Sequence, residues 1–136
     1  MKISVKAEYA LQAVFDLATQ PGGEPIRIAD IAKRRKIPQK FLELILSNLK
    51  HGGFVESRRG ADGGYLLARN PAQIMVGEII RHVDGPDDRR AMTEGFEEMW
   101  SRVDEAVKNT LGSTSFQQLA EDWQAKQSQY VANWEI

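Results

Sequence analysis

IPQKFLELILSNLKHGGFVESRRGADGGYLLAR, residues 37–69, decides the fold of this chain. The first half predicts a helix, because apolar residues recur three and four positions apart and so share one buried face. These residues are Phe41, Leu42, Ile45, Leu46 and Leu49. Pro38 fits a first helical turn, and Gly52 and Gly53 end the helix. The second half predicts two short strands, 54–57 and 65–69, joined by a glycine-rich turn.

Outside its apolar face, the predicted helix carries a polar stripe of Gln39, Lys40, Glu43, Ser47 and Lys50. Hydrogen-bonding groups near the N-terminal end are typical of recognition helices, which insert that end into the major groove of DNA. Glu43 can accept a hydrogen bond from a cytosine amino group. The alternative is a surface pair between Glu43 and Lys40 or Lys50. The stripe therefore indicates a DNA-reading helix.

The turn between the strands, residues 58–64 (RRGADGG), places Arg58 and Arg59 at the tip of the hairpin. Such a tip can reach a phosphate backbone or a minor groove, whose negative potential attracts guanidinium groups. The alternative is a solvated loop whose arginines have no function. The neighbouring helix favours the DNA-binding interpretation.

A first helix is predicted to begin at Ser4, whose side chain suits an N-cap, with Glu8 in the first turn. Its apolar stripe comprises Ala7, Ala10, Leu11, Val14, Leu17 and Ala18, and residues 21–23 (PGG) end it. Lys2 and Lys6 are candidate phosphate contacts. The alternative is that both lysines are simply solvated.

Residues 26–28 predict a short strand that pairs with the hairpin, and the spacing of Ile28, Ile31 and Ala32 predicts a second helix. Four basic residues, 33–36 (KRRK), close this helix directly before the reading helix. This position makes the run, and Arg35 within it, a candidate phosphate contact. The alternative is a solvated helix end, where cations are favoured by the helix dipole.

The composition is that of an ordinary soluble domain: 136 residues, 42% hydrophobic and 27% charged. No apolar run approaches the ~18 residues of a membrane span, the first residues lack the layout of a signal peptide, and there is no cysteine. We therefore expect a cytoplasmic protein without membrane association.

Positive charge is concentrated in the first half of the chain. Residues 1–70 contain 12 Lys and Arg against 7 Asp and Glu, a net charge of +5, whereas residues 71–136 contain 6 against 12, a net charge of −6. Such asymmetry indicates a basic half that faces DNA and an acidic half that faces elsewhere.

Two further helices are predicted after the hairpin, at 76–83 and 93–111, separated by Gly85 and Pro86. The longer one has an apolar stripe of Phe96, Met99, Trp100, Val103, Val107 and Leu111. A stripe outside the small first domain needs a partner to cover it, and the family resemblance described below implies that this partner is a second copy of the chain. The alternative is that the stripe packs on its own domain. A last helix is predicted at 115–134, and its aromatic residues Trp123, Tyr130 and Trp134 are expected to be buried against the dimer rather than to form a ligand site.

The order helix, strand, helix, turn, helix and hairpin predicts a winged helix-turn-helix. The fold class is therefore mainly α with a small β-hairpin wing and a long C-terminal dimerisation helix. We expect a DNA-binding domain at 1–86 and a helical dimerisation region at 87–136.

Three stretches also resemble one family: KISVKAEYAL (2–11), IADIAKRRKIPQKFLELILSNLKHGGFVESRRGADGGYLLARNP (28–71) and GEIIRHVDGP (77–86). They are similar to the bacterial Rrf-two regulators, which include repressors of iron-sulfur cluster assembly, nitric-oxide response and cysteine metabolism. The element RGADGGYLLAR (59–69) is the most specific part of the match.

The resemblance implies a homodimer that binds double-stranded DNA at a pseudo-palindromic operator. It further implies that Gln39, Lys40, Phe41 and Glu43 lie near base edges. The wing residues Arg58, Arg59 and Gly60 would enter the adjacent minor groove.

Many members of this family hold an iron-sulfur cluster with three cysteines placed before the long helix. The corresponding interval here, PDDRRAMTEGFEEMW (86–100), has none, so thiolate ligation of a cluster is excluded. A metal site of His82 with Asp84, Asp87 and Asp88 is disfavoured against an acidic loop, because hard cations need converging oxygens at a defined spacing. We therefore predict no cofactor and no metal.

The two histidines, His51 and His82, lie on different predicted elements, and no phosphate-binding loop or nucleophile motif occurs. An enzyme is not expected. The sequence instead predicts a dimeric, sequence-specific transcriptional regulator that represses its genes and is insensitive to redox agents. The alternative is a winged-helix docking module for another protein. Any switch is expected around residues 79–100, where the winged domain meets the long helix.

Overall fold

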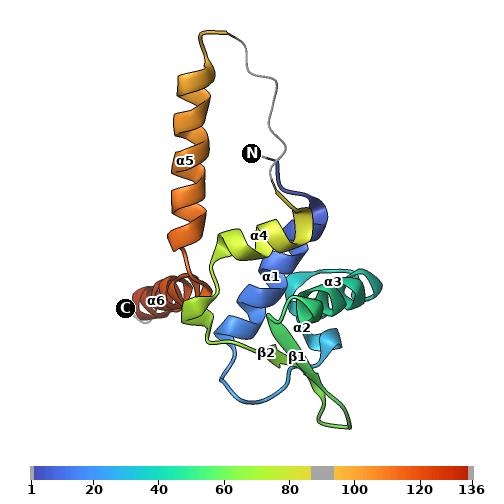
Figure 1. Ribbon diagram of the computed structural model, residues 1–136. Helices are drawn as coiled ribbons and strands as arrows, with labels where there is room; N and C mark the ends of the chain where they lie inside the picture. The colour runs from blue at the N-terminus through green and yellow to red at the C-terminus, as the bar shows by residue number, and fades with distance from the viewer. Residues whose placement is uncertain (1, 87–93, 135–136) are drawn as a thin grey trace.

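The computed structural model describes residues 2–86 and 94–134, and its elements follow the predicted order (Figure 1). The helices and strands are α1 (Val5–Thr19), α2 (Ile28–Arg35), α3 (Gln39–His51), β1 (Val55–Arg58), β2 (Gly64–Leu67), the short 3-10 helix η1 (Pro71–Gln73), α4 (Val76–Asp84), α5 (Glu97–Ser113) and α6 (Phe116–Trp134).

Helix α1 begins as predicted, because the Ser4 hydroxyl accepts a hydrogen bond from the Ala7 backbone N–H at 3.0 Å. The helix ends at Thr19, just before the predicted proline-glycine stop. Its buried face differs in part from the prediction. Leu11 and Ala18 are only half-buried, whereas the polar side chain of Asp16 is fully buried.

Helix α1 lies at the centre of the molecule, in contact with α2, α3, α4 and α6. The core that these helices enclose is built from large aliphatic side chains and one phenylalanine. Its largest fully buried residues include Ile31, Leu42, Ile45, Leu46, Leu49, Ile74, Ile79 and Phe116. Each such side chain stabilises the fold by about 1.5–3 kcal/mol. The α3 stripe is thus held against α1 by its four buried aliphatic residues.

Strands β1 and β2 form an antiparallel hairpin in which Val55 pairs with Leu67 and Arg58 with Gly64. The predicted strand at 26–28 is reduced to one bridge, in which Ile26 and Tyr65 exchange backbone hydrogen bonds at 2.8 Å, because Ile28 already begins α2. The close approach of the Ile26 backbone to the start of β2 requires glycine at position 64. A Cβ atom there would lie 2.3 Å from the Ile26 carbonyl oxygen.

The core extends beyond the predicted domain boundary at residue 86. Phe116 of α6 is 1% exposed, and Ala120 is 3% exposed. Backbone hydrogen bonds from Val76 to Thr114 (2.9 Å) and from Phe116 to Ile74 (3.0 Å) join the starts of α4 and α6. Residues 1–86 therefore do not enclose the core by themselves, because the first turns of α6 complete it.

Helix α5 rises away from this core (Figure 1). No residue of α5 is buried. The helix meets the domain at its C-terminal end, where Gly77 of α4 lies so close to Leu111 that an added Cβ would stand 3.3 Å from it. Its own domain therefore leaves part of the α5 stripe uncovered: Phe96, Met99 and Val103 are exposed, whereas Trp100, Val107 and Leu111 are half-buried. The helices in the described part of the chain are all too short or too polar to cross a membrane.

Candidate nucleic-acid interface

The outward face of α3 carries the predicted polar stripe. Leu42, Ile45, Leu46 and Leu49 point into the core and are at most 1% exposed. The opposite face presents the exposed side chains of Gln39, Lys40, Glu43, Ser47 and Lys50. The structure thus brings these five predicted residues together on one accessible surface, and Lys50 at its C-terminal end contacts the wing strand β1.

Phe41 does not belong to the buried face, and this part of the prediction is wrong. Its side chain is 37% exposed, and its ring meets Tyr9 of α1 edge-on with centroids 5.6 Å apart. The reason is the position of Phe41 around the helix axis. It lies at the margin of the buried stripe, where α1 covers one side of the ring and leaves the other side exposed. A role for Phe41 near base edges, implied by the resemblance, stays a prediction.

Lys50 joins α3 to the wing. Its Nζ donates a hydrogen bond to the Ser57 hydroxyl of β1 at 2.7 Å. The expected alternative, a surface pair with Glu43, is not formed by Lys50 or by Lys40 in the part of the chain that the structure describes. The Glu43 carboxylate is therefore exposed, and no cation pairs with it among residues 2–86 and 94–134.

At the wing tip, Arg58, Arg59 and Gly60 are all exposed. The Gly63 N–H donates to the Gly60 carbonyl at 3.0 Å, and Gly60 has a φ of +107°, which favours glycine. Arg58 pairs with Glu56 at 3.2 Å, a surface contact that contributes little. The tip is thus a tight turn that presents two guanidinium groups to solvent.

Arg27 supports this tip from the start of α2 by donating to the Ala61 carbonyl at 2.7 Å. Sequence reasoning missed this contact. The two residues are 34 positions apart, and a lone arginine before a helix has no local signal for a distant partner. The wing is therefore braced on both sides, by Arg27 at its tip and by Lys50 along β1.

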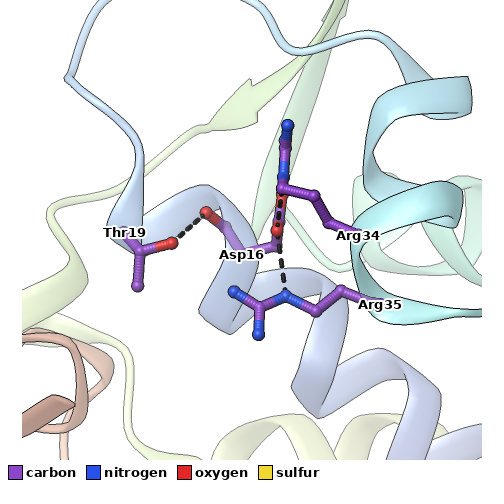
Figure 2. A network of polar contacts seen from close by, with 4 residues as sticks. All are labelled: Asp16, Thr19, Arg34 and Arg35. Carbon is purple, nitrogen blue, oxygen red and sulfur yellow. Dashed lines mark hydrogen bonds and ion pairs between the residues drawn. The ribbon is translucent and has the colours of Figure 1, made fainter. Parts of the chain in front are cut away.

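The main polar network inside the fold is centred on Asp16 of α1, whose side chain is fully buried (Figure 2). Arg34 donates to it from Nε and Nη2, both at 3.0 Å, and Arg35 donates from Nε at 2.9 Å. A buried carboxylate is costly unless it is paired, and the two arginines provide that pairing. The hydrogen bond with Asp16 raises the pKa of Arg34 above its ordinary value.

This network changes the interpretation of the basic run at 33–36. Arg35 also lies over the Phe15 ring at 4.8 Å, and its side chain is only 21% exposed. Two of the four cations therefore hold α2 against α1, while Lys33 and Lys36 are exposed. A phosphate contact by Arg35 stays a prediction. No local signal in the sequence pointed to this network, because Asp16 lies outside the predicted apolar stripe and its burial is evident only in the structure.

A shallow groove of about 400 Å³ lies between α3 and the start of α1. Its lining is mostly apolar, and it contains Lys6 from α1 and six residues of α3: Phe41, Leu44, Ile45, Ser47, Asn48 and His51. Lys6 therefore lies beside α3, and Lys2 is exposed near the N-terminal end. Phosphate contacts by these two lysines stay predictions.

His82 and Asp84 serve packing contacts in α4. The His82 Nε2 is 2.9 Å from the Asn48 carbonyl oxygen, and its ring meets Phe54 edge-on at 5.3 Å. Asp84 accepts hydrogen bonds from the Ser4 backbone N–H at 3.0 Å and from its hydroxyl. Asp87 and Asp88 lie outside the described residues. Across 2–86 and 94–134, no three histidine or carboxylate side chains converge as a metal site.

Comparisons with known proteins agree with this geometry. Residues 3–122 match the family model of Rrf2, described as an iron-dependent transcriptional regulator. The chain is 37% identical over 135 residues to the HTH-type transcriptional regulator CymR of Bacillus subtilis, covering 96% of this chain and 98% of that protein. It is 34% identical over 135 residues to the HTH-type regulator IscR of Xenorhabdus nematophila, covering 90% and 80%.

The fold is similar to the solved structure of CymR, the global cysteine regulator of B. subtilis, with a TM-score of 0.83 and 37% identity. The similar region covers 89% of this chain and 97% of that one. The predicted fold class, mainly α with a β-hairpin wing and a long C-terminal helix, is confirmed.

Proposed function

This chain belongs to the Rrf2 family of DNA-binding transcriptional regulators, and from that premise we propose that it binds a pseudo-palindromic operator as a homodimer and represses transcription there. The comparisons name regulators and no enzyme.

The single observation that supports direct DNA reading is the exposed polar face of α3 beside the exposed wing tip. Gln39, Lys40 and Glu43 stand at the N-terminal end of α3, the end that enters a major groove in helix-turn-helix proteins. In the proposed complex these groups lie at base edges, with Phe41 and Ser47 beside them. Glu43 accepts from a cytosine amino group.

The wing and the lysines would hold the duplex on either side of α3. Arg58, Arg59 and Gly60 reach the neighbouring minor groove from the tip that Arg27 braces. On the other side of α3, Lys6 and Lys2 contact phosphates, and Lys50 and Arg35 add positive charge near the backbone. Phosphate contacts of this kind position the protein, and the base contacts determine its specificity.

The dimer would form through α5. Three side chains of its apolar stripe are strongly exposed in one subunit: Phe96 at 51%, Met99 at 42% and Val103 at 41%. Trp100, Val107 and Leu111 on the same stripe are half-buried. Covering such a stripe with its two-fold copy contributes about 25 cal/mol per Å² of apolar area. Two subunits joined in this way would place their reading helices about one DNA turn, ~34 Å, apart.

The iron in the family description does not fit this chain. A thiolate-ligated cluster needs cysteines, and the sequence has none. Of the described histidines, His82 is turned toward Asn48 and Phe54, while His51 lies on the α3 groove. The proposed repressor therefore acts without a cluster.

Salt-dependent gel shifts test the proposal. Full-length protein is titrated onto duplex fragments from upstream of its own coding sequence, at several salt concentrations. Specific binding should weaken steeply as the salt concentration rises. The logarithm of the association constant should fall with the logarithm of the salt concentration, with a slope of about −0.9 for each phosphate neutralised. A run-off transcription assay on the retained fragment should show fewer transcripts as the protein occupies it. If no fragment were retained at low salt, a winged-helix docking module would replace the proposed function.

A further inference from the structure

Leu44 is the most exposed large apolar side chain among the described residues, at 66%. It lies on the outward face of α3, four residues after Lys40 and three before Ser47, so that it falls between these two polar groups on the same helical face. The other leucines of α3, Leu42, Leu46 and Leu49, are fully buried.

This exposure is not explained by the packing of the subunit. Leu44 borders the apolar groove beside Phe41, where Lys6 and His51 form the polar edge. Helix α5, the proposed dimer helix, rises on the opposite side of the molecule from the wing (Figure 1). A single exposed leucine is ordinary on a protein surface. At the middle of a reading helix, however, it occupies the place of a base-contacting group.

We propose that Leu44 is a specificity-determining residue that packs against the 5-methyl group of a thymine in the operator. This inference rests on the proposed function, because it requires α3 to lie in the major groove. The thymine methyl is the apolar group that base pairs present in that groove. Lys40 and Lys6 flank Leu44. These positive charges favour a polyanion such as DNA, rather than an apolar protein surface, as the molecule that contacts Leu44.

The position of Leu44 also predicts where the thymine lies. Lys40, one helical turn nearer the N-terminal end, donates to acceptors on a purine or to a phosphate. Leu44 then reaches the adjacent step, and Ser47 follows one turn later. One thymine in each half-site should therefore contribute through its methyl group rather than through hydrogen bonds.

Replacing thymine by uracil removes this methyl group and leaves the base-pairing edge unchanged. An operator is first selected from a pool of random duplexes by the full-length protein. Each thymine of one half-site is then replaced singly by deoxyuridine. For the wild-type protein, one replacement should weaken binding about fourfold, the effect of burying one methyl-sized group. Leu44→Ala should bind the thymine and uracil operators equally.

Leu44→Met is the matched control, because it keeps a large apolar side chain and should keep most of the discrimination. All three proteins should have the same melting temperature, since the side chain lies on the surface. The inference is overturned if no thymine responds to demethylation, or if Leu44→Ala discriminates as well as wild type. Failure to select any sequence would instead contradict the proposed operator binding, so the two failures are distinct.

Discussion

Helices α3 and α5 carry apolar residues at similar three-and-four spacings, yet they use them differently. In α3 the four aliphatic residues of the stripe are at most 1% exposed, because α1 and the wing cover them. The predicted stripe of α5 keeps Met99 at 42% and Val103 at 41% exposed, and Phe96, the N-cap residue before the helix, is 51% exposed. One helix therefore completes the domain, and the other presents an apolar face to whatever lies outside it.

The difference shows that periodicity specifies a helix and its apolar face but not the surface that covers that face. The polar sides differ as well. Around α3 the exposed groups include Lys6, Lys40 and Lys50, whereas α5 begins with Glu97 and Glu98. The two surfaces thus differ in charge. In our proposal the basic surface around α3 faces DNA, and α5 faces the second subunit.

The largest effect is expected from Val103→Glu on the α5 stripe. In a two-fold dimer the substitution places two carboxylates in an apolar interface, each costing several kcal/mol if unpaired. The protein should become a folded monomer in sedimentation experiments and lose cooperative operator binding.

Ser101→Glu is the matched control for this variant, because it adds the same charge to an exposed position away from the stripe. It should leave the dimer intact. A Val103→Glu protein that sedimented as a dimer would show that α5 is not the interface. The exposed stripe of α5 would then have another role.

Leu46→Ala should lower the free energy of unfolding by roughly 2–5 kcal/mol, since the side chain is fully buried and the cavity cannot be refilled by water. Urea denaturation at one protein concentration measures it. Leu44→Ala, two residues earlier on the exposed face, should change that free energy little. Equal losses for the two variants would contradict the assignment of the faces of α3.

Helices α1 and α3 and the wing show which parts of the structure the sequence could predict. Local signals were sufficient for the Ser4 cap of α1, the buried leucines of α3 and the glycine turn of the wing. Phe41 was placed in the core because spacing alone does not say how far α1 covers the margin of a stripe. The accessible polar face of α3 followed directly, because the polar residues lie opposite the buried ones.

Long-range polar contacts were not predictable from local patterns. Asp16 and its two arginines are 18 and 19 residues apart, and Arg27 and Ala61 are 34 apart. Such pairs arise only when separate helices pack, so no periodicity reports them. The first turns of α6 joined the core for the same reason, since Phe116 needs the space between α1 and η1.

Asp16→Asn should lower the free energy of unfolding by about 1–3 kcal/mol, because the amide retains fewer of the charged hydrogen bonds from Arg34 and Arg35. Asp62→Asn, the same change at an exposed position, is the control. Chemical denaturation of both variants provides the measurement. No loss for Asp16→Asn would mean that the arginines are held by other contacts and are available to DNA.

The Arg34 contribution has a defined pH dependence. Its pKa is raised in the folded state by the hydrogen bond with Asp16, so its stabilisation is fully present below the unfolded pKa and is lost only as pH rises through the folded one. Both values lie far above neutrality. Denaturation across the neutral range should therefore show no titration from Arg34.

A smaller and more selective effect is expected at the DNA-facing end. Arg59→Ala should weaken binding to operator and to random duplex together, because in the proposed complex the wing contacts the backbone and the minor groove. Gln39→Ala and Glu43→Ala should instead lower the ratio of the two affinities, by about 1–3 kcal/mol for each side chain that reads a base. Competition gel shifts measure both quantities. If Glu43→Ala left the ratio of operator to random-duplex affinity unchanged, Glu43 would not contact a base.

The smallest effect, none at all, is expected from iron and redox agents. In many members of the family that the sequence resembles, the cluster cysteines precede the long helix. This chain has no cysteine in the corresponding interval, residues 86–100, or elsewhere. A thiolate-ligated cluster or a reactive cysteine is the group on which nitric oxide, peroxide or iron depletion would act, and this chain can form neither. Protein purified without oxygen should therefore show no visible absorption, and its operator affinity should not respond to these agents in gel shifts. A coloured, iron-containing preparation whose affinity followed its iron content would show that non-thiolate ligands couple α5 to the reading helix.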